Sequence, residues 1–311
     1  MTSQSCPPPL RKPGLFSLIL VFFLHIYKRL RPNHSLHKFR KLADKQANRD
    51  AKIPREVTRR QIKLVNVTCD QLTHSSSNSR LVLHLYGGAG CVRIPNVEIP
   101  AIADLCVKLE ANALLPWYAL APEHPFPQGI EDCLTVYKQL LDNGTDPGQI
   151  ILSGSSAGGG TALGLLQKIK KLNLPMPACA VLISPSGDCL LRGASWVENA
   201  RKDPVFHLSE IIYFQQIMFS GAQLADPLVN VSLATDYSGY PPMYMCASST
   251  ELLRDVSTMA ANNADKSGVA FQLDIFEGSF HCMPIVAGMS GRQYRSIWDR
   301  IEYFINTHLN K

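Results

Sequence analysis

The 311-residue sequence lacks the Cys-x-x-Cys spacing that zinc and redox sites use, although it contains nine cysteines. It also lacks internal repeats and low-complexity tracts. We therefore expect separate buried thiols, and one folded domain preceded by an N-terminal tail is the simplest division of the chain. The scattered cysteines are Cys6, Cys69, Cys91, Cys106, Cys133, Cys179, Cys189, Cys246 and Cys282.

Most of the chain also lacks an excess of basic residues. Residues 1–60 carry 14 Lys and Arg against 3 Asp and Glu, whereas residues 61–311 carry 17 against 22. A nucleic-acid-binding domain normally has its basic patch on the folded part, so this distribution argues against nucleic acid as a partner. A basic end beside an apolar run points instead to a membrane surface.

The uncharged run Gly14–Tyr27 is short for a membrane span, which usually needs about 20 apolar residues and at least roughly 17. It fits a thin signal anchor or a helix lying in the interface, with a buried core helix as the alternative. No small-residue cleavage site follows it, which argues against a removed signal peptide. We expect membrane association through this run, with nearby cations at the headgroups. These cations are Lys28, Arg29, Arg31, Lys38, Arg40 and Lys41.

From about residue 61 the sequence alternates strand-like and helix-like segments. This pattern predicts an α/β fold, with a mostly parallel sheet covered by helices on both faces. Strands are expected at 79–86, 112–120, 149–154, 178–185, 240–248 and 269–278, and helices at 129–143, 156–173 and 291–309. The alternation breaks at 189–236, where the stretch LSEIIYFQQIMFSGAQ is apolar on more than one face. Such a segment fits an insertion folded over a site better than a sheet-covering helix.

The stretch LSGSSAGGG (152–160) follows a strand-like run. Within it Gly154, Ser156 and Gly158 fit the pattern G-x-S-x-G, which puts a serine on a sharp turn between a strand and a helix. Ser156 is therefore the candidate nucleophile.

A serine hydroxyl is a poor nucleophile at neutral pH, so it needs a histidine base and an acid that orients this base. His207, His281 and His308 follow Ser156, and His281 lies in a loop directly after a predicted strand, where the base is expected. His281 is therefore the candidate base.

The acid is expected on the loop after the preceding strand. Glu251 comes first on that loop, and Asp255 follows four residues later. Because Asp255 would lie one helical turn further along, Glu251 is the predicted acid and Asp255 the alternative.

Acyl transfer also requires N–H donors aimed at the negative oxygen of a tetrahedral intermediate. The loop YGGAG (86–90) follows a strand and has glycines that permit close backbone approach. We predict an oxyanion hole with the N–H groups of Gly88, Ala89 and Ala157 as donors and Gly87 shaping the turn.

Over about residues 79–285 the chain resembles the hormone-sensitive-lipase-like branch of the α/β-hydrolases. The matching stretches are YGGAG, LAPEHPFPQGIEDCL, GSSAGG, LISPSGD, ADPLVNVS, YPPMYM, ELLRD and FHCMP. The resemblance implies an esterase or lipase that acts without metal or cofactor. It also implies a cap made of N-terminal helices plus the insertion at 189–236. We accordingly expect an anchor segment at 1–60 that forms part of the cap, and a catalytic domain at 61–311.

The chain departs from the pattern of that branch at several positions. Tyr86 stands in place of the histidine of HGGG, and Ala89 in place of its third glycine. Ser155 replaces the usual Asp or Thr, Ala119 the Arg of YRLAPEHP, and Glu251 the commoner Asp. The oxyanion loop is therefore expected to be less rigid or differently shaped, although its backbone donors do not depend on the histidine side chain.

These features predict a serine hydrolase of carboxylic esters that forms an acyl-enzyme. A site held against a bilayer under an apolar lid favours apolar, membrane-partitioning esters such as acylated sterols or glycerolipids. Two alternatives stay open. One is a ligand-binding pseudoenzyme, like the plant hormone receptor of this branch that lacks the base, and the other is a membrane-bound acyltransferase.

The expected location is a membrane, that of the endoplasmic reticulum, with its side left open. More positive charge follows the apolar run than precedes it, which favours a cytosolic body. Membrane-anchored relatives with luminal bodies and four glycosylation sequons favour the opposite side. The sequons begin at Asn33, Asn66, Asn143 and Asn230.

Overall fold

The computed structural model describes residues 7–31, 35–47, 51–76, 78–286 and 291–309. Its centre is an eight-stranded sheet in the order β1-β2-β4-β3-β5-β6-β7-β8. The pairs β1–β2 and β2–β4 are antiparallel, and the remaining neighbours are parallel. The predicted α/β fold with a mostly parallel sheet is therefore confirmed.

The bounds of the elements agree with the expected strands and helices over most of the chain. The strands are β1 (Val57–Leu64), β2 (Val67–His74), β3 (Leu81–Leu85), β4 (Asn112–Pro116), β5 (Ile150–Ser155), β6 (Cys179–Ile183), β7 (Met243–Ser248) and β8 (Phe271–Phe276). The α-helices are α1 (Leu15–Leu30), α2 (Leu36–Ala47), α3 (Pro95–Leu109), α4 (Gln128–Asp142), α5 (Ser156–Lys171), α6 (Ser195–Glu198), α7 (Leu208–Met218), α8 (Arg254–Lys266) and α9 (Arg292–Leu309). The sequence pattern did not predict β1, β2 or α3, and the strand that it predicted at 112–120 is longer than β4.

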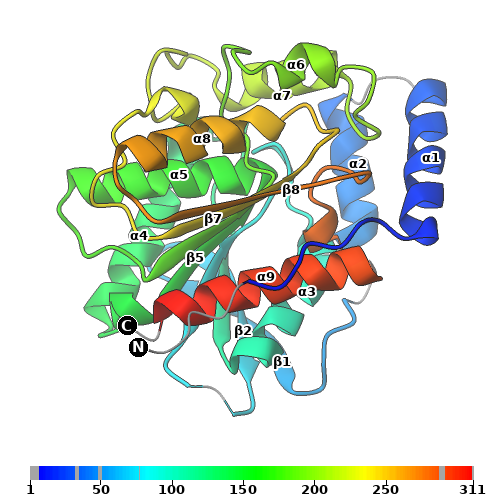
Figure 1. Cartoon of the computed structure of the whole chain (residues 1–311). Coiled ribbons are helices and arrows are strands. Elements are labelled where there is room, and N and C mark those ends of the chain that lie inside the picture. Colours follow the sequence, from blue (N-terminus) through cyan, green and yellow to red (C-terminus); the bar gives the residue numbers. More distant parts are fainter. Residues whose placement is uncertain (1–6, 32–34, 48–50, 77, 287–290, 310–311) are drawn as a thin grey trace.

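The core lies on both faces of the sheet. Strands β5, β6 and β7 are buried along their whole length, as expected for central parallel strands covered on both sides. Helices α3 and α9 cover one face, and α4, α5 and α8 cover the other (Figure 1). Helix α9 buries Ile297, Ile301 and Ile305, which recur every four residues and so form one apolar stripe.

The parallel pairing decides where the candidate site forms. Because β3, β5, β7 and β8 run in the same direction, the loops that follow them gather at one edge of the sheet. These loops carry the predicted oxyanion residues, nucleophile, acid and base.

Above this edge lie α6, α7 and the loops between β6 and β7, with α1 and α2 beside them (Figure 1). Phe39 of α2 packs on Phe214 of α7, with ring centroids 5.1 Å apart. The Nζ of Lys28 on α1 donates to the carbonyl of Asp203 over 2.7 Å. The division into segments 1–60 and 61–311 stays a prediction, and β1 enters the sheet at Val57, before that boundary.

Three of the cations expected at headgroups instead bind protein groups. Lys28 is buried against the loop before α7, and Arg31 pairs with Glu210 of α7. Arg40 pairs with Glu123, 2.6 Å away. A long cationic side chain can bind a carbonyl or carboxylate of the protein as readily as a lipid phosphate. The expected headgroup role was therefore wrong for these three residues.

Helix α1 also overturns the buried-core-helix alternative, because most of its large apolar side chains are exposed. No helix within the described ranges combines the length and apolarity needed to cross a bilayer. The sequon residue Asn230 is fully buried, so a glycan cannot attach there in the folded protein, whereas Asn66 and Asn143 are exposed. Asn33 lies outside the described residues.

The cysteines in the described part of the chain carry free thiols, and all of these except that of Cys189 are buried, as predicted. Burial raises the pKa of the Cys69 thiol to about 12, which keeps it protonated at neutral pH. Cys6 lies outside the described residues.

Candidate active site

Ser156 lies at the junction of β5 and α5, on the sharp turn that its motif predicts. Its φ of 51° falls in the left-handed region, which non-glycine residues seldom adopt. The two motif glycines permit this turn. A Cβ on Gly154 would lie 2.6 Å from the carbonyl oxygen of Gly158, and one on Gly158 would lie 2.1 Å from that of Leu85.

The structure brings the predicted nucleophile, base and acid into contact. The Nε2 of His281 lies 2.9 Å from the Oγ of Ser156, and its Nδ1 lies 2.6 Å from the Oε2 of Glu251. His281 comes from the loop after β8, and Glu251 from the loop after β7. The arrangement allows His281 to take a proton from Ser156 while Glu251 holds the ring.

The carboxylate of Glu251 is fixed from behind. Its Oε1 accepts hydrogen bonds from the Ser184 hydroxyl over 3.0 Å and from the Ser248 amide over 2.7 Å. Glu251 is fully buried, so these bonds supply what water would otherwise give. They leave Oε2 facing His281.

Asp255, the alternative acid, is engaged elsewhere. Its Oδ2 accepts from the Ser195 amide over 2.9 Å, and its Oδ1 pairs with Arg254 over 2.7 Å. Burial raises the pKa of Asp255, but the hydrogen bonds from Arg254 and the Ser195 amide outweigh it and the net pKa is lowered. Of the other downstream histidines, His207 binds the Lys28 carbonyl and His308 packs against Phe304.

The electrostatics of His281 suit a group that must become positively charged. Burial lowers its pKa, but the Cys282 sulfur and the Glu251 carboxylate raise it well above the ordinary value of histidine. Phe206 packs edge-on against the imidazole, with ring centroids 5.1 Å apart. The ring is thus held between a carboxylate and an aromatic side chain.

The loop 86–90 lies beside Ser156. Gly88 and Ala89 have φ of 118° and 56°, so the loop turns sharply at these two residues. In the described part of the chain, neither of their amides donates to a protein acceptor. Ala157 is in the first turn of α5, where amides have no intrahelical partner. These three groups suit the stabilisation of a negative oxygen, whereas the Gly87 amide already donates to Glu98 over 2.9 Å.

Tyr86, at the position of the family histidine, anchors the loop from inside the core. Its hydroxyl donates to Asp70 over 2.8 Å, and its carbonyl accepts from the Tyr118 hydroxyl over 2.5 Å. The Trp117 indole donates to the same Asp70 oxygen over 2.7 Å. No sequence motif pointed to Asp70 or Glu98 as partners of this loop.

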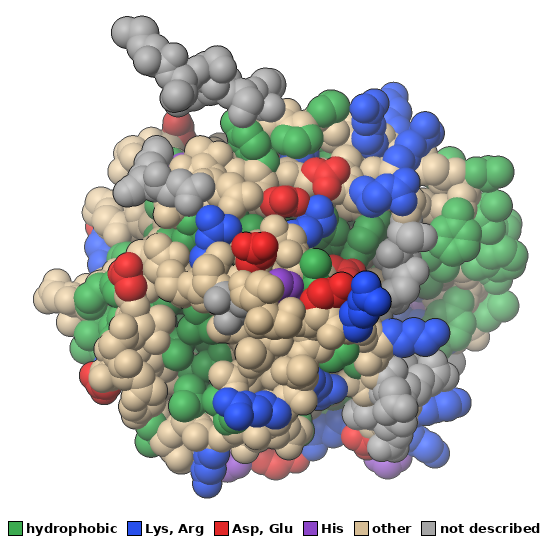
Figure 2. Space-filling view, turned by 90° about the horizontal axis from the view of Figure 1, so that it is seen from below, with side chains coloured by type: hydrophobic (Ala, Val, Ile, Leu, Met, Phe, Trp, Pro, Cys, Tyr) green, Lys and Arg blue, Asp and Glu red, His purple; other side chains and the backbone are tan. Residues whose placement is uncertain are grey.

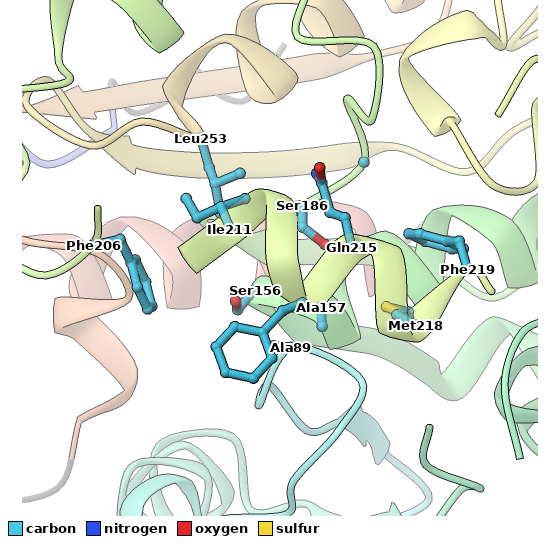
Figure 3. A pocket seen from close by; sticks show the side chains of 12 residues that line it. Ala89, Ser156, Ala157, Ser186, Phe206, Ile211, Gln215, Met218, Phe219 and Leu253 are labelled. Carbon is cyan, nitrogen blue, oxygen red and sulfur yellow. The ribbon is translucent and has the colours of Figure 1, made fainter. Parts of the chain in front are cut away.

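Two apolar cavities meet at Ser156. The smaller, of about 50 Å³, lies under α7, as Figure 3 shows. The larger, of about 280 Å³, extends towards α1 and α2. The small cavity is lined by Ala89, Ser156, Ala157, Ser186, Gly187, Phe206, Ile211, Phe214, Gln215, Met218, Phe219 and Leu253. The large cavity adds Leu24, Tyr27, Phe39, Val205, His281 and Ile285, among others. Within the described ranges, no group of three His, Cys, Asp or Glu residues is arranged to hold a metal.

Known proteins are similar to this chain in sequence. A family model described as the alpha/beta hydrolase fold matches residues 82–285. The acetyl-hydrolase of Streptomyces hygroscopicus is 28% identical over 214 residues, covering 69% of this chain and 71% of that protein. The esterase of Acinetobacter venetianus is 29% identical over 223 residues, covering 71% and 73%.

The structure is similar to solved esterases as well. An esterase/lipase from an uncultured bacterium superposes with a TM-score of 0.87 at 26% identity, covering 96% of this chain and 100% of that one. An esterase of the bacterial hormone-sensitive lipase family superposes with a TM-score of 0.87 at 23% identity, covering 96% and 99%, and this likeness concerns the fold.

The chain belongs to the α/β-hydrolase family. Its structure is also similar to a hormone-sensitive lipase from a metagenome library, with a TM-score of 0.87 at 25% identity, covering 96% of this chain and 100% of that one. It is a carboxylic ester hydrolase of the esterase/lipase class.

Proposed function

We propose that Ser156, His281 and Glu251 form the catalytic triad of this ester hydrolase. Ser156 Oγ attacks the ester carbonyl while its proton passes to His281 Nε2, and Glu251 orients the ring and stabilises the imidazolium. His281 then gives the proton to the departing alkoxide, which leaves an acyl-enzyme. Water, deprotonated by His281, then attacks the acyl carbon. The bond to Ser156 Oγ breaks, the imidazolium returns its proton to that oxygen, and the acid leaves.

The observation that carries this proposal is the pair of contacts to His281, at 2.9 Å from Ser156 and 2.6 Å from Glu251. Both are within hydrogen-bond reach, and they connect opposite ring nitrogens. The negative oxygen of each tetrahedral intermediate would be bound by the amides of Gly88, Ala89 and Ala157.

We further propose that the substrates are apolar esters that partition into membranes, such as acylated sterols or glycerolipids. The cavity of about 280 Å³ supports this class because its wall is mostly apolar. Leu24 and Tyr27 of α1 are part of that wall, so the same helix borders the cavity and the molecular surface.

The proposed membrane contact is the outer face of α1, defined by its exposed apolar side chains. Phe16, Phe22 and Phe23 are 64%, 62% and 60% exposed. Figure 2 shows apolar side chains gathered along the right edge of the molecule, where α1 lies in Figure 1. Exposed apolar patches of this kind mark interaction surfaces, and exposed cations nearby suit anionic headgroups. These cations are Arg11, Lys12, Arg29, Lys38, Lys41 and Lys45.

Turnover of p-nitrophenyl esters of graded acyl length tests the reaction. The wild type should hydrolyse them, and Ser156→Ala should lose several orders of magnitude in kcat while the fold persists. Ser155→Ala, the matched neighbour, should lose far less. Hydrolysis that survives in Ser156→Ala would contradict the assignment.

Sedimentation with vesicles of phosphatidylcholine and phosphatidylserine tests the membrane surface. A triple variant, Phe16→Ser with Phe22→Ser and Phe23→Ser, should leave the vesicle pellet and lose turnover of a vesicle-embedded ester, while it keeps turnover of a soluble one. The matched control is Val197→Ser, which changes an exposed apolar residue on α6. Equal binding by the triple variant and the wild type would refute the α1 surface.

We propose the membrane of the endoplasmic reticulum as the location. Treating the full chain, expressed in eukaryotic cells, with a glycosidase reports on which side of the membrane the catalytic body lies. A luminal body would carry glycans at the exposed Asn66 or Asn143 and none at the buried Asn230. A cytosolic body would show no glycosidase-dependent change in mass. Absence from the microsomal fraction would reject the location.

A further inference from the structure

We infer that Glu98 is a positioning residue for ester hydrolysis. Its carboxylate joins the oxyanion loop to the nucleophile turn and so fixes the separation between the backbone donors and Ser156. This inference rests on the proposed roles of Ser156 and the loop amides.

Glu98 lies on α3 and is 2% exposed. Its Oε1 accepts a hydrogen bond from the Gly87 amide over 2.9 Å. Its Oε2 accepts one from the Ser155 hydroxyl over 2.8 Å and lies 2.8 Å from the Nε2 of His84. One carboxylate therefore binds three groups that come from two different strands and their loops.

The two main partners of Glu98 are direct neighbours of the proposed reacting groups. Gly87 precedes Gly88 and Ala89, whose amides are the proposed donors, and Ser155 precedes Ser156. A Cβ on Gly87 would lie 3.0 Å from both Glu98 Oε1 and Ser155 Oγ, so the loop, the helix and the turn are closely packed here.

The sheet itself does not supply this connection. Backbone pairing between β3 and β5 ends with Leu85 opposite Gly154. Gly87 and Ser155 follow that last pair along their strands, where the backbone after β3 becomes a loop and the backbone after β5 becomes a turn. The Glu98 carboxylate connects the two segments beyond the last backbone pair by binding the Gly87 amide and the Ser155 hydroxyl. At this point the distance between the proposed donors and Ser156 is set.

His84 completes the network and defines its hydrogen bonds. Its Nδ1 lies 3.0 Å from the Ser153 hydroxyl, and the residue is fully buried. Since an ionised Glu98 only accepts, His84 donates from Nε2, and its Nδ1 accepts from Ser153. A buried carboxylate is costly unless it is hydrogen-bonded, and here three donors satisfy it.

The test uses the full chain and four variants: Glu98→Gln, Ser155→Ala, the combination of both, and Asp274→Asn. Glutamine keeps the shape of Glu98 but replaces one acceptor with a donor. Asp274 is the matched control, a buried acid on β8 that binds the Tyr244 hydroxyl and Arg300 away from the site. The readouts are kcat and KM for p-nitrophenyl butyrate, and Ki for a trifluoromethyl ketone, whose serine adduct carries an oxyanion.

We expect Glu98→Gln to lower kcat about tenfold, with KM changed less than about twofold. The Ki of the trifluoromethyl ketone should rise by about the same factor as kcat falls. Ser155→Ala should lower kcat about threefold, and the double variant should be no worse than Glu98→Gln because both changes break one connection. Asp274→Asn should lower Tm and leave kcat and Ki unchanged.

Unchanged kcat and Ki in Glu98→Gln, or multiplied losses in the double variant, would overturn the inference. Equal losses in Asp274→Asn would also overturn it, since the effect would then be general destabilisation. If Glu98→Gln does not fold, Ser155→Ala decides by the same kcat and Ki comparison. A wild type without ester hydrolysis would refute the proposed function and this inference together, whereas an active wild type with an unaffected Glu98→Gln refutes this inference alone.

Discussion

Replacing Glu251 with glutamine changes one carboxylate oxygen of the proposed acid into an amide nitrogen. The Oε1 side of Glu251 accepts from the Ser248 amide over 2.7 Å and from the Ser184 hydroxyl. In Glu251→Gln these donors hold the amide oxygen in place, so the amide nitrogen faces His281 Nδ1. That nitrogen donates, which puts the imidazole proton on Nε2, opposite Ser156. His281 then has no lone pair for the serine proton.

The expected loss follows from the cost of the wrong tautomer, about 10³- to 10⁴-fold in kcat. This corresponds to about 4–5.5 kcal/mol of transition-state stabilisation. Steady-state kinetics on p-nitrophenyl butyrate measure it, with thermal unfolding to verify the fold. The matched variant Asp255→Asn should lose stability through Ser195 and Arg254 and keep kcat within about threefold. A loss of kcat below tenfold in Glu251→Gln, or a larger loss in Asp255→Asn, would show that Glu251 is not the acid that orients His281.

Two further predictions concern pH and packing. The pKa of His281 is raised, and the proposed reaction needs the neutral imidazole. We therefore expect kcat/KM to fall as the pH drops through a value above about 6.5. Glu251→Gln should move this fall in kcat/KM to lower pH. A profile that stays flat to pH 6 would contradict this. Gly158→Ala should lower the free energy of unfolding by about 1–3 kcal/mol and reduce kcat, because its Cβ meets the Leu85 carbonyl. Gly14→Ala is the control, since its Cβ would lie in open space, and it should change neither quantity. Thermal unfolding and steady-state kinetics measure the two effects.

The sheet could be predicted from sequence because its central strands are continuous apolar runs separated by helical periods. Strands β1 and β2 gave a weaker signal, since β1 alternates with exposed polar residues such as Arg60 and Lys63. The strand expected at 112–120 was too long because β4 ends at Pro116. After it, Trp117 binds Asp70 of β2, and Tyr118 binds the Tyr86 carbonyl in the loop 86–90.

The contacts among Ser156, Glu251 and His281 could be predicted because acyl transfer by a serine needs these residue types in a fixed order after successive strands. The role of Glu98 could not be predicted in this way, because Glu98 reaches Ser155 and Gly87 from α3 through tertiary packing. One of its partners is a backbone amide, which no residue type in the sequence reveals. One signal was present: Glu98 stands in a helical stretch beside the apolar Val97 and Ile99, where a carboxylate needs an internal partner.

The N-terminal segment shows a different limit of sequence reasoning. Its charge and apolar character were visible, but the partners of its cations depend on tertiary packing. Lys28 and Arg31 turn towards the cap because Asp203 and Glu210 offer buried acceptors there, while Arg29 stays exposed between them. A linear charge pattern holds no information on which of these side chains face the protein.

The central claim is that Ser156 is the nucleophile of an ester hydrolase. Mass spectrometry of the protein treated with a fluorophosphonate probe tests it most directly, with ester turnover followed in the same sample. We expect one adduct, on the peptide at Ser156, formed in parallel with the loss of turnover and absent from Ser156→Ala. An adduct on Ser155, or full loss of turnover without an adduct at Ser156, would contradict it.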